Sequence, residues 1–158
     1  MKQRLSHYDA AGDVSMVDVS SKEVTLRTAS AHAFVAMRRE VLDALPQNKK
    51  GNPLEIARIA GIMAAKKTAE LIPLCHQLPL SHVGVELELT EQGIAITASA
   101  ATSAQTGVEM EAMTAACVAA LTIYDMTKAL DKRIQISEVY LLEKTGGKSG
   151  TYRRATET

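Results

Sequence analysis

One long helical segment constrains the fold of this chain more than any other feature. Residues 108–131, VEMEAMTAACVAALTIYDMTKALD, follow Gly107 and consist mainly of alanine, methionine, leucine and valine. A helix that is apolar on nearly every side is stable only when other elements surround it. We therefore predict a buried central helix, and we expect the rest of the chain to pack around it.

Segments with alternating apolar and polar residues predict the strands that pack on this helix. Residues 22–37 alternate from Val24 and predict a strand that runs into a helix start. Residues 82–90 and 94–102 flank the turn EQG and predict an antiparallel hairpin with one buried face. Further elements are expected as helices at residues 37–47 and 53–72 and a final strand at 134–144. This order favours an α+β fold with an antiparallel sheet packed against long helices.

Size and charge limit the function classes. A chain of 158 residues is long enough for a single domain with one core. We expect a flexible N-terminal arm at 1–20, the domain at 21–150 and a polar C-terminal tail at 151–158. The formal net charge of zero argues against a general nucleic-acid or membrane-surface binder. With no signal-peptide pattern and no membrane-length apolar run, a cytoplasmic protein with reduced thiols is expected.

The run KTGGKSG, residues 144–150, partly resembles the end of a phosphate-binding P-loop. The P-loop motif requires a glycine where this chain has Leu142, and it requires a following helix that the short tail cannot provide. A P-loop is therefore excluded. Two interpretations stay open: a double-glycine loop whose lysines close over an anionic ligand, or a solvated C-terminal loop.

Two carboxylates share one face of the long helix. At 100° per residue Glu111 and Asp125 lie within about 80° of one another, but they are about 21 Å apart along the axis. Lys128 is within reach of Asp125, and the residues alone favour a structural ion pair over a proton-transfer pair. Either the two carboxylates have different roles, or a symmetry-related copy brings them together at an interface of an oligomer.

The stretch LIPLCHQLPL, residues 71–80, places Cys75 beside His76. A metal site would need three or four ligands, and no nearby cluster supplies them. A nucleophile–base couple is also disfavoured, because neighbouring residues of an extended segment point to opposite sides. Cys75 is then expected in the core, with His76 either in the core or presented to a ligand. Pro73 and Pro79 stiffen the segment, as suits the wall of a pocket.

Together, six runs in consistent order resemble the molybdenum-cofactor biosynthesis protein C family, the cyclic pyranopterin monophosphate synthases. The runs cover essentially residues 14–150: MVDVS (16–20), ARIAGIMAAKKT (57–68), LIPLCH (71–76), TGVEMEAMTAA (106–116), ALTIYDMTKA (120–129) and KTGGKSG (144–150). Gln77 stands where the family more often has proline.

The resemblance implies a lyase of molybdenum cofactor biosynthesis that acts on a GTP-derived substrate. The family converts 3′,8-cyclo-7,8-dihydroguanosine 5′-triphosphate to cyclic pyranopterin monophosphate, a pterin, and releases pyrophosphate without a redox cofactor. The implied fold is ferredoxin-like. The implied assembly is a homohexamer, a trimer of dimers, with active sites at subunit interfaces.

The resemblance also assigns roles to particular residues. A partly buried Asp125 is expected as the catalytic acid/base, with Lys128 and Lys144 transferring protons and stabilising charge. No metal ligands are implied. The expected substrate-binding residues are Leu74, Cys75, His76, Met110 and Glu111, together with Lys50 and Lys66 at the phosphates.

Two other functions are considered. A nucleotide-binding or regulatory module with a ferredoxin-like fold would use the same lysines without requiring Asp125. A metal-binding protein would instead depend on Cys75 and His76.

Overall fold

The computed structural model describes residues 6–155, which form one domain. In chain order the elements are β1 (Thr25–Ala36), α1 (Arg39–Ala44), the short 3-10 helix η1 (Leu45–Gln47), α2 (Pro53–Ala65), α3 (Thr68–Leu71), β2 (Leu80–Leu89), β3 (Gly93–Ala104), α4 (Glu109–Thr127), β4 (Gln135–Thr145) and β5 (Tyr152–Arg153).

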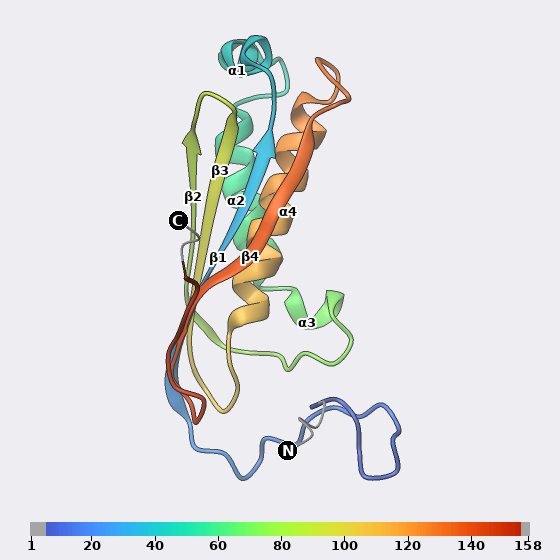
Figure 1. Ribbon diagram of the computed structural model, residues 1–158, viewed down its shortest axis with the longest axis vertical. Coiled ribbons are helices and arrows are strands. Elements are labelled where there is room, and N and C mark those ends of the chain that lie inside the picture. Colours follow the sequence, from blue (N-terminus) through green and yellow to red (C-terminus); the bar gives the residue numbers. More distant parts are fainter. Residues whose placement is uncertain (1–5, 156–158) are drawn as a thin grey trace.

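The strands form one antiparallel sheet in the order β2-β3-β1-β4-β5. The long helices α2 and α4 lie together on one side of this sheet and run along it, as Figure 1 shows. The predicted α+β class and antiparallel hairpin are confirmed. With β5 set aside, the elements follow the order β-α-β-β-α-β, which is compatible with the ferredoxin-like fold that the resemblance implies.

Small side chains make the core. From Ala29 onward every second residue of β1 faces the helices and is buried, and the same alternation occurs in β3 from Ile94. Half of the buried positions on α4 are alanine, which lets the helix approach both the sheet and α2 closely. The predicted central helix is confirmed, except that a stripe with Cys117 and Leu121 is exposed in the single chain.

The predicted helix at 53–72 is wrong in one respect, because it is divided into α2 and α3. It begins as expected, with Pro53 at the first position and the Asn52 side chain accepting hydrogen bonds from the backbone N–H groups of residues 54 and 55. The break follows Ala65, whose carbonyl accepts a 2.9 Å hydrogen bond from the buried hydroxyl of Thr68. This side-chain bond occupies a carbonyl at the helix end, where regular pairing stops.

The junction between the first strand and the first helix differs from the sequence-based expectation. Residues 22–37 do not enter a helix directly, because β1 continues to Ala36 and α1 begins at Arg39. The polar tail contributes β5, which pairs with Glu143 and Lys144 of β4. The parts of the predicted arm and tail at 1–5 and 156–158 lie outside the described residues. No helix within residues 6–155 is both long and apolar enough to cross a bilayer.

Candidate active site

Eight of the ten residues predicted for the site fall into two groups at opposite ends of α4, and Lys66 and Lys144 belong to neither group. Both carboxylates belong to one unbroken helix, Glu109–Thr127, so their separation of about 21 Å along the axis applies to the folded chain. We call the group at the start of α4 the N-end site: Leu74, Cys75, His76, Met110 and Glu111. We call the group at its end the C-end cluster: Lys50, Asp125 and Lys128.

The N-end site is a real hollow of about 260 Å³. Residues 74–76 lie in the connection between α3 and β2, opposite the first turn of α4, and all five members of the N-end site line the hollow. The His76 ring forms a 2.8 Å hydrogen bond through Nε2 with the carbonyl of Val17. The segment MVDVS therefore lies across the same hollow, which connects three of the runs that carried the resemblance.

Burial raises the pKa of two side chains in the N-end site, Glu111 and Cys75. The Glu111 side chain belongs to a residue only 4% exposed, and this burial raises the pKa of its carboxyl, with nearby Glu109 raising the pKa further. Burial also raises the pKa of the Cys75 thiol, and the charge of Glu111 adds to this effect. The sulfur is therefore kept as a thiol rather than a thiolate, which suits a wall of the hollow and not a nucleophile.

The C-end cluster is a surface ion pair with a third cation nearby. Lys128 Nζ lies 2.6 Å from Asp125 Oδ1, and the two side chains are 50% and 60% exposed. Asn48 donates a 2.8 Å hydrogen bond to the carbonyl of Met126, which holds the loop that carries Lys50 against the end of α4. The hydrogen bond from Lys128 lowers the pKa of Asp125, and the charges of Lys128 and Lys50 lower it further.

The expected partial burial of Asp125 is therefore wrong for the single chain. Its carboxyl is solvated and ionised, and the same pair raises the pKa of Lys128. At rest the pair therefore consists of a carboxylate and an ammonium group.

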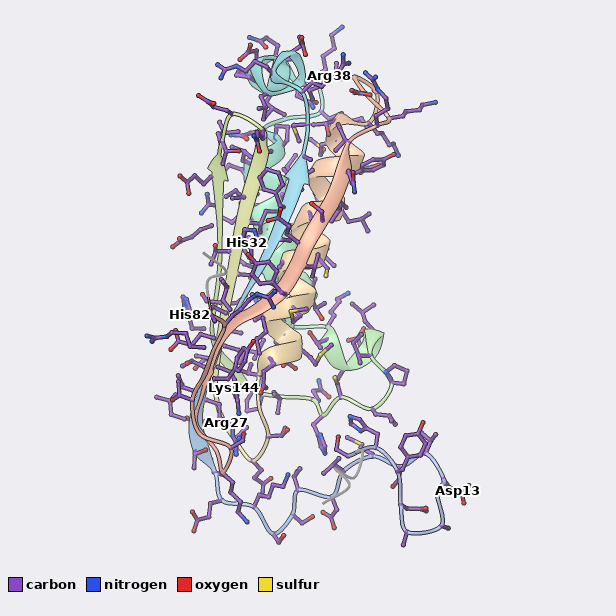
Figure 2. All side chains as sticks on the ribbon, in the orientation of Figure 1. Asp13, Arg27, His32, Arg38, His82 and Lys144 are labelled. Atoms are coloured by element: carbon purple, nitrogen blue, oxygen red, sulfur yellow. The ribbon has the colours of Figure 1, made fainter. Side chains whose placement is uncertain are left out.

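Lys144 belongs to a second hollow beside the N-end site. We call this space, of about 710 Å³, the cationic hollow, because its basic lining residues are Lys22, Arg27, Lys144 and Lys148. Figure 2 places Arg27 and Lys144 near each other at the end of the sheet that extends past the start of α4. Lys144 Nζ hydrogen-bonds the hydroxyl of Ser149 within the double-glycine loop.

Sequence reasoning did not select Lys22 or Arg27, and it considered Lys148 only as part of a loop. A signal for Arg27 existed in the pattern of β1. Arg27 has the same parity as the buried residues Ala29 and Ala31, so it lies on the face that turns toward the helices. A charged residue at such a position must meet polar groups or a ligand.

Lys66 is the C-terminal cap of α2 and is exposed. Because Gly61 of α2 packs on Ala115 of α4 while the loop before α2 contacts Met126, the two helices are antiparallel. Lys66 is therefore at the same end of the molecule as the N-end site. One chain thus brings together the residues of the N-end site with Lys144 nearby, and separates them from Lys50, Asp125 and Lys128.

Among residues 6–155, no three or more His, Cys, Asp or Glu side chains gather in a group that could hold a metal ion.

Comparison with known proteins gives one consistent answer. The model of the MoaC family matches residues 16–147 of this chain. A protein of Staphylococcus carnosus named cyclic pyranopterin monophosphate synthase is 49% identical over 157 residues, which is 96% of this chain and 98% of that protein. Proteins of the same name are 55% identical in Dinoroseobacter shibae, over 94% of this chain and 96% of that protein, and 55% identical in Geotalea uraniireducens, over 96% and 98%.

Proposed function

The chain belongs to the MoaC family, and from that premise we propose that it is a cyclic pyranopterin monophosphate synthase of molybdenum cofactor biosynthesis. The proposed substrate is 3′,8-cyclo-7,8-dihydroguanosine 5′-triphosphate, and the proposed reaction is that of a lyase that releases pyrophosphate. A cytoplasmic location belongs to the same proposal.

The observation that carries the proposal is the N-end site. Two segments distant in sequence, Leu74–His76 and Met110–Glu111, line one hollow, and they are the segments that the family resemblance assigns to substrate binding. The hollow combines a buried carboxyl, an imidazole and apolar walls. Such a combination suits a flat heterocycle with several exchangeable protons.

The charges of the two groups support a division of the chemistry. Rearrangement of the purine requires several proton transfers, and loss of pyrophosphate requires stabilisation of developing negative charge. The ionised Asp125 accepts a proton and the Lys128 ammonium donates one. The pKa shifts of the pair keep both groups charged at rest, and the same shifts make Asp125 a weaker base and Lys128 a weaker acid until the substrate separates the pair. The ammonium groups of Lys50, Lys66 and Lys144 stabilise the phosphates.

This division requires two copies of the chain at each site. A small substrate does not reach across about 21 Å, so the C-end cluster that acts on it comes from a neighbouring subunit. Exposed apolar side chains on the outer faces of α2 and α4 support an assembly: Ile59, Met63 and Leu121 are 57%, 54% and 59% exposed. The proposed assembly is a homohexamer built as a trimer of dimers.

The proposed function is tested with Asp125→Ala. The variant is expected to bind the substrate with an affinity close to that of the unchanged protein and to lose product formation by about a hundredfold or more, because it lacks the proton acceptor. Binding is measured by calorimetry and the product by chromatography after oxidation to a fluorescent pterin.

Asp43→Ala is the matched control, because Asp43 is an equally exposed carboxylate, 60%, in a surface ion pair with Arg39. Its turnover is expected to be unchanged. Normal turnover by Asp125→Ala would show that the catalytic assignment is wrong, and binding without turnover in the unchanged protein would favour the regulatory module.

A further inference from the structure

The C-terminal tail pairs with the strand that carries Lys144. In β5, Tyr152 pairs with Lys144 and Arg153 pairs with Glu143. We propose that β5 and Arg154 form a clasp that keeps Lys144 in position, and that the contact between Arg154 and Tyr140 holds this clasp on the sheet. The positioning role rests on the proposed function, whereas the clasp itself follows from the geometry below.

The double-glycine loop, residues 144–150, depends on its neighbours for a fixed shape. Gly146, Gly147 and Gly150 have φ values of 88°, 74° and 64°, and glycine loses more conformational freedom on ordering than any other residue. Within the loop, the N–H of Gly150 donates a 3.2 Å hydrogen bond to the carbonyl of Gly147, and Lys144 Nζ contacts the hydroxyl of Ser149. Because Ser149 and Gly150 are exposed, these bonds alone do not order the loop.

Strand β5 holds the far end of the loop, but its own pairing is short. It has only two residues, and a pairing of this length is marginal by itself. The N–H of Arg154 adds a 2.8 Å hydrogen bond to the carbonyl of Leu142. Arg153 Nη2 lies 3.0 Å from Glu143 Oε1, but the arginine side chain is 74% exposed, and such surface ion pairs contribute little. The backbone pairing therefore needs support from another contact.

Arg154 supplies this contact at the ring of Tyr140. Its guanidinium carbon lies 4.3 Å from the ring centroid, which is the geometry of a cation–π interaction. The ring is itself held, because the imidazole of His32 stacks on it with 5.0 Å between the centroids and 28° between the planes. His32 belongs to β1, which flanks β4 on the side away from β5. The three side chains thus connect β1, β4 and the tail across the sheet.

This stack and Lys144 lie on opposite faces of the sheet. His32 alternates with the buried residues of β1 that face the helices, so it lies on the outer face, and Tyr140 is its cross-strand partner. Lys144 instead pairs with a buried residue of β1 and points toward the helices. Arg154 and Tyr140 therefore do not touch a substrate in the N-end site of the same chain. They are positioning residues, because they act through the backbone at Lys144.

The backbone at Lys144 is fixed from two sides. Ala29 of β1 pairs with it on one side, and Tyr152 of β5 pairs with it on the other. Release of β5 removes one of these neighbours and frees the end of the loop that carries Ser149, the hydrogen-bond partner of the Lys144 ammonium. The clasp thus sets where this ammonium points.

The first experiment measures backbone hydrogen exchange in residues 142–154 of the full-length protein by mass spectrometry. Arg154→Ala is expected to speed this exchange by about three- to thirtyfold, as loss of a cation–π contact implies for a local opening equilibrium. Arg153→Ala is the matched control, because it removes the neighbouring arginine from an exposed ion pair. Its effect is expected to be less than about twofold.

Variants of Tyr140 test whether the aromatic ring holds Arg154. Tyr140→Phe keeps the face of the ring and is expected to exchange like the unchanged protein, whereas Tyr140→Leu is expected to match Arg154→Ala. Combining Tyr140→Leu with Arg154→Ala is expected to add nothing further, since both changes remove the same contact. Arg154 is exposed at the end of the sheet, so its variants test the clasp even if Tyr140→Leu does not fold.

Synthase kinetics test the positioning role. Arg154→Ala is expected to lower kcat about tenfold with little change in KM, because Lys144 acts on charge that develops in the transition state. Arg154→Lys keeps a cation at the ring and is expected to restore most of kcat. Arg153→Ala is expected to keep normal kcat. The thermal unfolding midpoints of all three variants are expected to stay close to that of the unchanged protein, because the contact is peripheral.

Three results would overturn the clasp: exchange unchanged by Arg154→Ala, equal effects of Arg153→Ala and Arg154→Ala, or equal effects of Tyr140→Phe and Tyr140→Leu. Faster exchange with normal kcat in Arg154→Ala would overturn the positioning role. No product from the unchanged protein, together with faster exchange in Arg154→Ala but not in Arg153→Ala, would contradict the proposed function and leave the clasp intact.

Discussion

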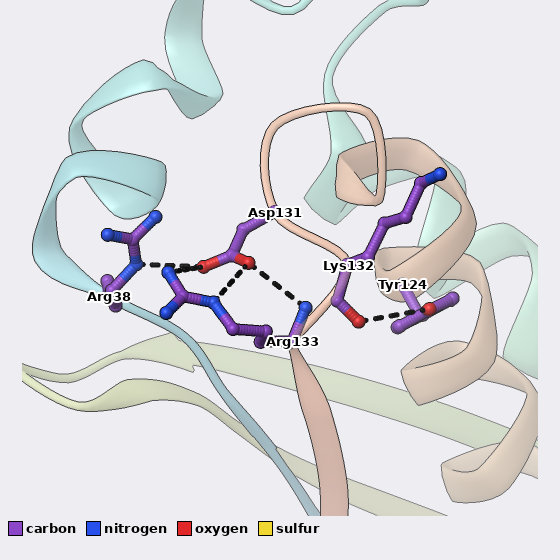
Figure 3. Close-up of polar contacts among 5 residues, drawn as sticks. All are labelled: Arg38, Tyr124, Asp131, Lys132 and Arg133. Atoms are coloured by element: carbon purple, nitrogen blue, oxygen red, sulfur yellow. Dashed lines mark hydrogen bonds and ion pairs between the residues drawn. The ribbon is translucent and has the colours of Figure 1, made fainter.

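Two buried carboxylates differ in protonation because of their neighbours. Glu111 is buried at the start of α4, and this burial raises the pKa of its carboxyl. Asp131, after the end of α4, is also largely buried but contacts two arginines (Figure 3). Its carboxylate oxygens lie 2.8 Å from Arg38 Nε and 3.1 Å from Arg133 Nε. The hydrogen bonds of Arg133, and then that of Arg38, hold the pKa of Asp131 well below its usual range. Glu111 is therefore the carboxyl that is more easily protonated. Asp131 stays ionised and connects the α4–β4 turn to the start of α1 through its ion pair with Arg38.

Asp131→Asn is expected to lower the thermal unfolding midpoint at pH 7 by several degrees, because both arginines lose their anionic partner. Since the pKa of Asp131 is lowered in the folded chain, the ion pairs stabilise it fully above the unfolded pKa of about 4, and this stabilisation is lost as the pH falls through the folded pKa. The difference in midpoint between the variant and the unchanged protein is therefore expected to shrink below about pH 4. Differential scanning calorimetry at a series of pH values measures it.

Asp43→Asn is the control for Asp131→Asn, because its pair with Arg39 is exposed on both sides and contributes little at any pH. A loss of stability equal to that of the control, or a difference that grows in acid, would contradict the assigned role of Asp131.

At the scale of elements, the close contact between α2 and α4 depends on one glycine. A Cβ atom on Gly61 would lie 2.9 Å from the carbonyl oxygen of Ala115 and 3.0 Å from a methyl group of Val85. Helix α2 is therefore packed against the backbone of α4 with no room for a methyl group. This contact sets the spacing of the helix layer, and so the position of Lys66 relative to the N-end site.

Gly61→Ala tests two opposing effects. Alanine favours the helix by about 1 kcal/mol, whereas overpacking against a backbone carbonyl costs about 1–3 kcal/mol. We expect the steric cost to dominate and the urea midpoint to fall at constant protein concentration. Far-UV circular dichroism checks that helix content is kept. An increase in stability would mean that α2 and α4 can move apart at little cost.

At the scale of the whole molecule, the separation of the N-end site from the C-end cluster is the dominant fact. Helix α4 runs along the sheet (Figure 1). It carries Glu111 near its start and Asp125 near its end. No rearrangement of side chains closes this separation within one chain. The assembly of chains therefore determines whether the candidate residues form one site.

Coexpression of His76→Ala with Asp125→Ala tests for shared sites. Each variant alone is expected to be inactive. In mixed oligomers about a quarter of the sites combine an intact N-end site from one chain with an intact C-end cluster from another, so activity is expected to recover to about that fraction.

Coexpression of His76→Ala with Glu111→Ala is the matched control, because both residues line the hollow of the same chain and no intact site can form. Full activity of a monomer by light scattering, or no recovery in the first mixture, would contradict shared sites.

Much of the fold followed from local patterns. The alternation in residues 22–37, the turn between β2 and β3 and the apolar run of α4 predicted their elements because side-chain periodicity is a local property. The break between α2 and α3 was missed, since helix propensity continues through Lys66 and only the bond from Thr68 to the Ala65 carbonyl marks the end. The site residues were assigned by the family resemblance. None of the matching segments alone shows which of these residues lie close together in one folded chain.

The sequence by itself determined the family, the order of the elements and which residue types are available for chemistry. Only the tertiary structure decided that Asp125 is solvated rather than partly buried, that Val17 lies on His76 and that Arg27 meets the double-glycine loop. The reason is physical: exposure and contact depend on where one element ends relative to its neighbours. The sheet extends past the first turn of α4, and this difference in length leaves the cationic hollow beside the N-end site. No local sequence motif encodes that difference.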